Sequence, residues 1–199
     1  MFDFKIISKI FSDFLNGTSD ISDFKSKARL VNLIRSDIET NQKLWNLEDS
    51  ARMIELGSEH IASAKQEIDK NNQIRNDLIM KIDVEIVNQM QIVPLDSQEQ
   101  FYSESPGIII DRLAILYIKL SIIRDLLLII KEEDLRKEYR KKEDVILEQV
   151  NRLGNFLDSY FSKLRNKEVF FEVQQPVKIY NDNRIKRYIK LLQRSKNNS

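Results

Sequence analysis

The segment from Ser105 to Leu120, SPGIIIDRLAILYIKL, decides the fold class of this chain. It opens with a helix start signal, because serine is a favoured N-cap residue and proline suits the first helical position. The apolar run that begins here, Gly107 to Ile130, is long enough to cross a membrane. The charged residues within it are Asp111, Arg112, Lys119, Arg124 and Asp125. Because charged side chains are costly inside lipid, we expect no membrane span and interpret this segment as the central helix of a soluble bundle.

The rest of the chain is also poor in turn residues, with four glycines and three prolines among 199 residues. Such scarcity is typical of long helices rather than of many short strands. The sequence therefore predicts an all-α bundle of about five to six helices, several of them long. The expected helices cover residues 2–15, 22–56, 58–90, 105–131, a charged stretch ending near 166, and about 183–193.

Three regions are expected from these patterns. An N-terminal amphipathic helix lies within residues 1–20, and the helical bundle occupies residues 21–166. The C-terminal region, residues 167–199, combines an extended segment, a short helix and a frayed tail from Arg194. Residues 169–180 can form a short β-hairpin or remain extended around Pro176.

Composition excludes several classes of function. The 32 basic and 31 acidic residues nearly cancel, so nothing in the overall charge attracts nucleic acid, and we expect no nucleic-acid partner. The absence of cysteine excludes disulfides, cysteine-ligated zinc and iron–sulfur centres. The single histidine, His60, argues against a His-rich zinc site or a Ser-His-Asp triad within one chain. Because the start of the chain does not look like a signal peptide, a cytoplasmic location is expected.

Polar residues interrupt the apolar stripe of the third expected helix. Asn72 and Arg75 take positions that should continue the stripe, and Asp69, Asn76 and Asp83 follow beside it at heptad spacing. Burying such groups is costly unless they are paired. Two readings stay open: a polar network inside the bundle, or the wall of a ligand pocket.

The second expected helix behaves in the same way around Trp45. Glu48, Asp49 and Arg52 lie on the same side as this tryptophan. Trp45 can be a core anchor or a platform for a ligand. Arg52 can contact a ligand, or it can be a local partner of the two acids at i,i+3 or i,i+4 spacing.

The central helix needs anionic partners for its two cations. Arg112 and Lys119 are seven residues apart and share a face, while Asp111 lies inside the apolar block. The partners can be acids on neighbouring helices, or a phosphate or carboxylate of a ligand. The helix start beside Gly107 can also receive an anion. Whether Asp111 pairs with Arg75 or faces a cavity stays open.

Three motifs taken together resemble a known bacterial family. They are LWNLEDSAR (44–52), IDKNNQIRND (68–77) and SPGIIIDRLAILYIK (105–119). In this order they resemble the domain-of-unknown-function family 4254, DUF4254, over about residues 32–140. The resemblance implies a helical protein that is often encoded among glycosyltransferases for lipopolysaccharide or other surface polysaccharides. It implies no reaction.

The first functional hypothesis is therefore a ligand-binding or accessory protein of surface-polysaccharide biosynthesis. A polar pocket would bind a sugar or a phosphate-containing ligand between the second, third and fourth helices. The candidate ligand-binding residues are Trp45, Glu48, Asp49, Arg52, Asp69, Asn72, Arg75, Asn76, Asp111, Arg112 and Lys119.

Two alternatives belong to other classes. A Mg²⁺-dependent helical phosphohydrolase acting on nucleotides or nucleotide sugars would use carboxylates on facing helices, with Asp77 and Asp83 as further metal candidates. The regular paired-acid spacing of such enzymes is absent, so neither a cofactor nor a catalytic residue is assigned. A pure protein-interaction module, docking to a glycosyltransferase or forming a homodimer, would use the same polar groups only as an internal network.

Overall fold

The computed structural model describes residues 2–18, 28–92, 100–173 and 184–196, with side chains up to residue 192. Six α-helices occur in these ranges, which confirms the predicted all-α class. They are α1 (Phe4–Leu15), α2 (Ala28–Ala51), α3 (Gly57–Met90), α4 (Pro106–Ile129), α5 (Glu133–Arg165) and α6 (Lys186–Lys196).

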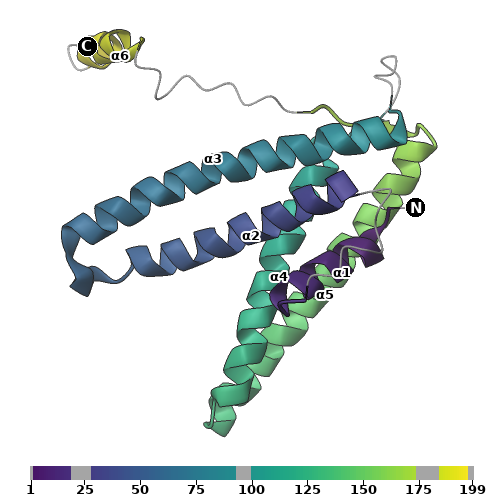
Figure 1. Ribbon diagram of the computed structural model, residues 1–199, viewed down its shortest axis with the longest axis horizontal. Coiled ribbons are helices and arrows are strands. Elements are labelled where there is room, and N and C mark those ends of the chain that lie inside the picture. The colour runs from purple at the N-terminus through teal and green to yellow at the C-terminus, as the bar shows by residue number, and fades with distance from the viewer. Residues whose placement is uncertain (1, 19–27, 93–99, 174–183, 197–199) are drawn as a thin grey trace.

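Two long helical hairpins build the fold. Helices α2 and α3 run side by side, and α4 and α5 form a second pair that crosses the first at a steep angle (Figure 1). Because α4 contacts both α2 and α3 as well as α5, the core lies where the hairpins cross. Fully or almost fully buried core side chains include Ile34, Ile38, Ile82, Ile86, Ile109, Ile110, Leu113, Leu157 and Phe161.

Helix α1 packs on its own bundle. Ile7, Ile10 and Phe11 form its buried face. The backbone N–H of Phe4 donates to Asp158 Oδ1 on α5 at 2.7 Å. On α4, the Tyr117 hydroxyl donates to Ser8 Oγ at 2.5 Å. The amphipathic start of the chain therefore supplies part of the core.

The predicted end of the second helix was wrong. Helix α2 ends at Ala51, and a 3₁₀ turn (Ile54–Leu56) leads into α3. The N–H groups of Arg52 and Met53 bond to carbonyls three residues back, which tightens and closes the helix. Among the described residues, no apolar surface covers Ile54, which is 77% exposed, so packing does not extend the helix to Leu56. The predicted start near residue 22 lies outside the described residues.

The extended segment near residue 169 exists, but its partner is remote in sequence. Strand β2 (Val169–Phe170) pairs with β1 (Gln100–Phe101), and the pairing is parallel. Parallel strands need a long crossover, and α4 and α5 provide it. A hairpin within residues 169–173 is therefore not formed, while residues 174–180 lie outside the described part. At the C-terminus, α6 reaches Lys196, so backbone expected to fray is helical to that point.

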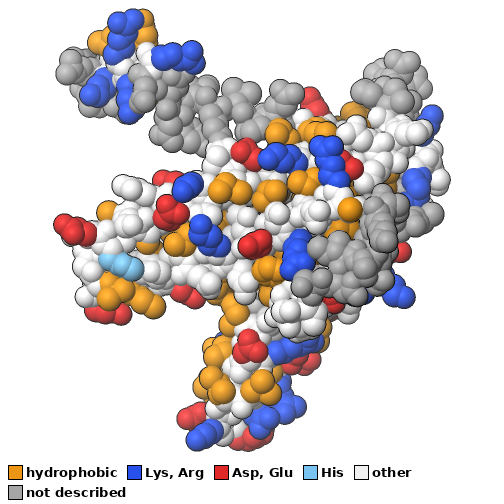
Figure 2. Space-filling model, viewed as in Figure 1, with side chains coloured by type: hydrophobic (Ala, Val, Ile, Leu, Met, Phe, Trp, Pro, Cys, Tyr) orange, Lys and Arg blue, Asp and Glu red, His pale blue; other side chains and the backbone are white. Residues whose placement is uncertain are grey.

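The far end of the α4–α5 hairpin exposes apolar side chains. Leu128 is 85% and Ile129 is 70% exposed, and apolar patches lie along this arm in Figure 2. Within the described ranges, no helix combines the length and apolar composition needed to cross a membrane.

Candidate functional site

A buried ion pair joins the three helices that carry the sequence motifs. Asp111 on α4 is 3% exposed. It accepts hydrogen bonds from Arg75 Nε at 2.6 Å and Arg75 Nη2 at 2.5 Å, both from α3. Asn41 on α2 donates its Nδ2 to the same carboxylate at 2.9 Å. The structure thus pairs Asp111 with Arg75, and this hydrogen bonding raises the pKa of the arginine.

Beside this pair lies a carboxyl group that the sequence analysis did not single out. Asp37 on α2 is 0% exposed, and as a carboxylate neither of its oxygens finds a donor among the described residues. Burial, followed by repulsion from Asp111, raises the pKa of Asp37 well above its ordinary value, although Arg75 opposes this. A proton on Asp37 would leave the cluster of Asp37, Arg75 and Asp111 close to neutral. The signal was present, since Asp37 interrupts the apolar row that contains Ile34 and Ile38.

A second buried carboxylate closes the start of α4. Asp83 on α3 accepts from Ser105 Oγ at 2.5 Å and from the Gly107 N–H at 2.7 Å. Burial raises the pKa of Asp83 to about 6, while the two hydrogen bonds oppose the rise. A Cβ on Gly107 would lie 2.7 Å from the carbonyl oxygen of Ile79 and 2.8 Å from Asp83 Oδ1. The start of α4, a candidate site for an anionic ligand, therefore binds the chain's own Asp83 carboxylate.

A polar pocket of about 260 Å³ opens next to the ion pair. It brings together six of the predicted ligand-binding residues, five from α2 and α3 and Arg52 from the turn after α2. Ile115 of α4 adds an apolar wall. The lining residues are Asn41, Leu44, Trp45, Glu48, Asp49, Arg52, Asn72, Arg75 and Ile115.

The polar pocket has a charged residue at its inner end and charged residues at its rim. At the inner end, Arg75 is 27% exposed and its guanidinium is fixed by the ion pair with the buried Asp111. At the rim, Arg52 lies 3.3 Å from Asp49, and both side chains are mostly exposed. Trp45, the only tryptophan of the chain, packs partly against the core and also lines the pocket.

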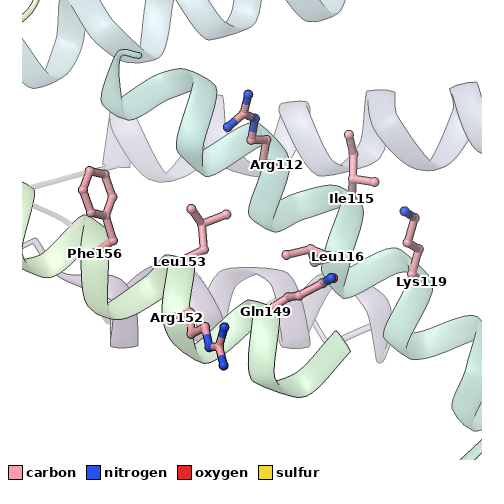
Figure 3. Close-up of a pocket in the computed structure, with 8 residues that line it drawn as sticks. All are labelled: Arg112, Ile115, Leu116, Lys119, Gln149, Arg152, Leu153 and Phe156. Atoms are coloured by element: carbon pink, nitrogen blue, oxygen red, sulfur yellow. The ribbon is translucent and has the colours of Figure 1, made fainter. Parts of the chain in front are cut away.

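Arg112 and Lys119 lie in a different hollow. They line a groove of about 520 Å³ between α4 and α5, and Figure 3 shows side chains from both helices facing it. Arg112 is paired with Glu104, with 2.5 Å between Nη2 and Oε1. The two predicted cations thus do not converge with Arg75. The groove is otherwise lined by Ile115, Leu116, Gln149, Arg152, Leu153 and Phe156.

The remaining predicted residues lie outside both hollows. Asp69 and Asn76 are exposed on α3, and Asp77 accepts a hydrogen bond from Gln73 at 2.8 Å. In the described part of the chain, no three histidine, aspartate or glutamate side chains gather closely enough to hold a metal ion.

Comparison with known proteins gives a family but no characterised relative. No curated protein and no solved structure matches this sequence significantly. A family model described as "Protein of unknown function (DUF4254)" matches residues 31–173 and so includes all three motifs. Since this match spans most of the 199 residues, the chain belongs to the DUF4254 family.

Proposed function

We propose that this protein binds a small hydroxylated ligand, a single sugar unit, in the polar pocket between α2, α3 and α4. The observation that carries the proposal is the composition of the pocket. An indole, carboxylates, amides and guanidinium groups face one space of about 260 Å³. Sites that recognise small molecules combine apolar walls with a few converging polar groups in this way.

The chemistry of a sugar matches these groups. A sugar ring presents C–H faces that can pack on the indole of Trp45, and hydroxyls that both donate and accept hydrogen bonds. Glu48 and Asp49 can accept from hydroxyls, and Asn72 can do both. The volume lies below the range of about 300–1,000 Å³ typical of drug-sized ligands. The pocket therefore suits one ring better than a whole nucleotide sugar.

The ion pair behind the pocket supports binding of a neutral ligand. Two N–H groups of Arg75 are used by Asp111, and a guanidinium group has five. The other three can bond to hydroxyls without reorientation, because Asp111 holds the side chain in place. Since Asp111 already offsets the charge of Arg75, and Arg112 and Lys119 lie in the groove, the pocket favours a sugar over its phosphate.

The setting that we propose for this ligand is the biosynthesis of lipopolysaccharide or another surface polysaccharide. Support for it comes from the resemblance of the three motifs to a family often encoded among glycosyltransferases. In that setting the protein would act as a ligand-binding accessory factor.

The test uses Trp45 as a reporter. Because it is the only tryptophan and lines the pocket, its fluorescence reports directly on occupancy. The purified protein is titrated with neutral monosaccharides, sugar phosphates and nucleotide sugars. We expect a neutral sugar to change the fluorescence, and Asn72→Ala or Glu48→Gln to weaken its binding about tenfold, or about 1.4 kcal/mol.

Arg112→Ala is the matched control, because it removes an exposed cation that lines only the groove. Its affinity for the sugar should equal that of the wild type. Two results would contradict the proposal: no compound changes fluorescence or thermal stability, or Arg112→Ala weakens binding as much as Asn72→Ala does.

The two other hypotheses draw less support from the described residues. No carboxylate cluster among the described residues supports the Mg²⁺-dependent phosphohydrolase. The apolar groove between α4 and α5 supports the interaction module. Measurement of the mass in solution tests its homodimer form, and a single-copy mass at high concentration would contradict that form.

A further inference from the structure

Helix α6 differs from every other helix in its surroundings. It has 11 residues, and in Figure 1 it lies apart from the crossed hairpins. Tyr188, Leu191 and Leu192 are 50%, 58% and 64% exposed. Three large apolar side chains on one short helix thus face solvent rather than the bundle core.

The residues of α6 are sorted into two faces. Ile185 precedes the helix by one residue, and Tyr188, Ile189 and Leu192 follow it at spacings of three, four and seven. In a helix this spacing places them on a single stripe. Between them stand Lys186, Arg187 and Lys190, whose backbone positions lie off this stripe, and the Arg187 guanidinium packs over the Tyr188 ring at 4.6 Å. Figure 2 shows basic and apolar side chains together on this helix.

The charge of this segment contrasts with that of the whole chain. Residues 184–199 contain six basic residues and no acidic one. The other residues therefore contain 26 basic and 31 acidic side chains. The near-zero net charge is therefore the sum of a strongly cationic C-terminal segment and a mildly acidic rest of the chain.

We propose that α6 binds the surface of an anionic lipid bilayer, with its apolar stripe in the acyl boundary and its cations among the phosphates. Helices with one apolar face and a Lys/Arg-rich polar face lie in the membrane interface in this manner. At 1.5 Å per residue, α6 is about 17 Å long. Since a bilayer core is about 30 Å thick, the helix lies on the membrane and does not cross it.

Other partners fit these observations less well. A nucleic acid would neutralise the cations but leave the apolar stripe in water. The groove between α4 and α5 offers an apolar floor, yet Arg112, Lys119 and Arg152 line it. Among the residues that the structure describes, no carboxylate lines this groove to attract the cations of α6. A bilayer with anionic headgroups satisfies both faces at once.

The proposal is tested by co-sedimentation of the full chain with vesicles. One set contains phosphatidylcholine only, and the other also contains 30% phosphatidylglycerol. We expect binding to the anionic vesicles alone at 0.1 M salt, and loss of binding at 0.5 M, because salt screens the attraction. Each cation near an anionic surface strengthens binding about fivefold. Lys186→Gln with Arg187→Gln and Lys190→Gln should therefore weaken binding about a hundredfold.

Two further variants separate a membrane from a general polyanion. Tyr188→Ser with Leu192→Ser removes exposed apolar surface from the stripe and keeps every charge, so it should weaken vesicle binding about tenfold or more. Lys137→Gln with Arg140→Gln and Lys141→Gln removes three exposed cations from α5 and should leave binding unchanged. Unchanged thermal unfolding midpoints in all three variants show that the bundle is intact.

Three results would overturn the proposal. The first is no binding to anionic vesicles at 0.1 M salt. The second is an equal loss of binding in the α5 control, which would indicate bulk charge. The third is full vesicle binding by the apolar variant together with tight binding of single-stranded RNA, which would make α6 a polyanion site. The proposal does not depend on the sugar pocket, so each can fail while the other stands.

Discussion

Removal of the Arg75 charge is the most informative perturbation of the motif cluster. Arg75→Met keeps most of the side-chain volume and removes the guanidinium. Asp111, which is 3% exposed, then keeps only Asn41 Nδ2 as a described donor and lies beside Asp37. A buried negative charge is left without its counter-charge.

The expected loss of stability is large. Breaking a buried ion pair by removing one partner costs about 3–5 kcal/mol. We expect the lower end, about 3 kcal/mol, because Arg75 is 27% exposed and a protonated Asp37 places no second negative charge beside Asp111. Against a typical total stability of about 5–15 kcal/mol, such a loss is easily measured.

The loss should also depend on pH, and its sign follows from the carboxyl groups. The pKa of Asp37 is raised in the folded state by burial. The folded protein therefore binds its proton more tightly than the unfolded chain, and this stabilisation fades as the pH rises. Arg75 opposes the shift, so its removal makes the effect stronger. The Arg75→Met loss should be larger at pH 8 than at pH 5.

Urea unfolding, followed by Trp45 fluorescence and by circular dichroism at both pH values, measures the effect. Arg112→Met is the control, because its pair with Glu104 is about half exposed and should contribute about 1 kcal/mol or less. Adding Asp111→Asn to Arg75→Met removes the stranded charge and should restore most of the stability. A loss below about 1 kcal/mol at pH 8, or equal losses at both pH values, would refute the reasoning.

Three further predictions concern the contacts between helices. Gly107→Ala should cost about 1–3 kcal/mol or more in urea unfolding, since its Cβ would lie 2.7 Å from the backbone oxygen of Ile79; an unchanged midpoint would exclude this close approach. In the wild type, the raised pKa of Asp83, about 6 in the folded protein against an ordinary value of 3.8, should lower stability by about 3 kcal/mol as the pH rises from 4 to 6. Asp83→Asn should remove this fall. If the variant and the wild type keep parallel pH profiles, Asp83 does not titrate as described. Tyr117→Phe should cost about 1 kcal/mol by removing the bond to Ser8, and calorimetry that shows no change would mean that α1 docks without it.

Local signals were sufficient for most of the helices. The Ser105–Pro106 start is confirmed, because Ser105 accepts from the Ile108 N–H and Pro106 is the first helical residue. Where the prediction failed, the decisive contacts were not local. The end of α2 depends on whether a neighbour covers Ile54, and the partner of β2 lies about seventy residues earlier in the chain.

The sequence by itself determined the helical class, because apolar residues recur at helical spacing and turn residues are scarce. Breaks in that spacing also indicated Asp83 and Asp111, which are buried, but Asp37 was missed, and Asp69 and Asn76 are exposed. Only the tertiary structure decided their partners. Asp111 pairs with Arg75, Asp83 binds the start of α4, and Arg112 pairs with Glu104 and lines the groove between α4 and α5. The reason is geometric: periodicity gives the direction of a side chain about its own helix, but how two helices cross decides which side chains meet.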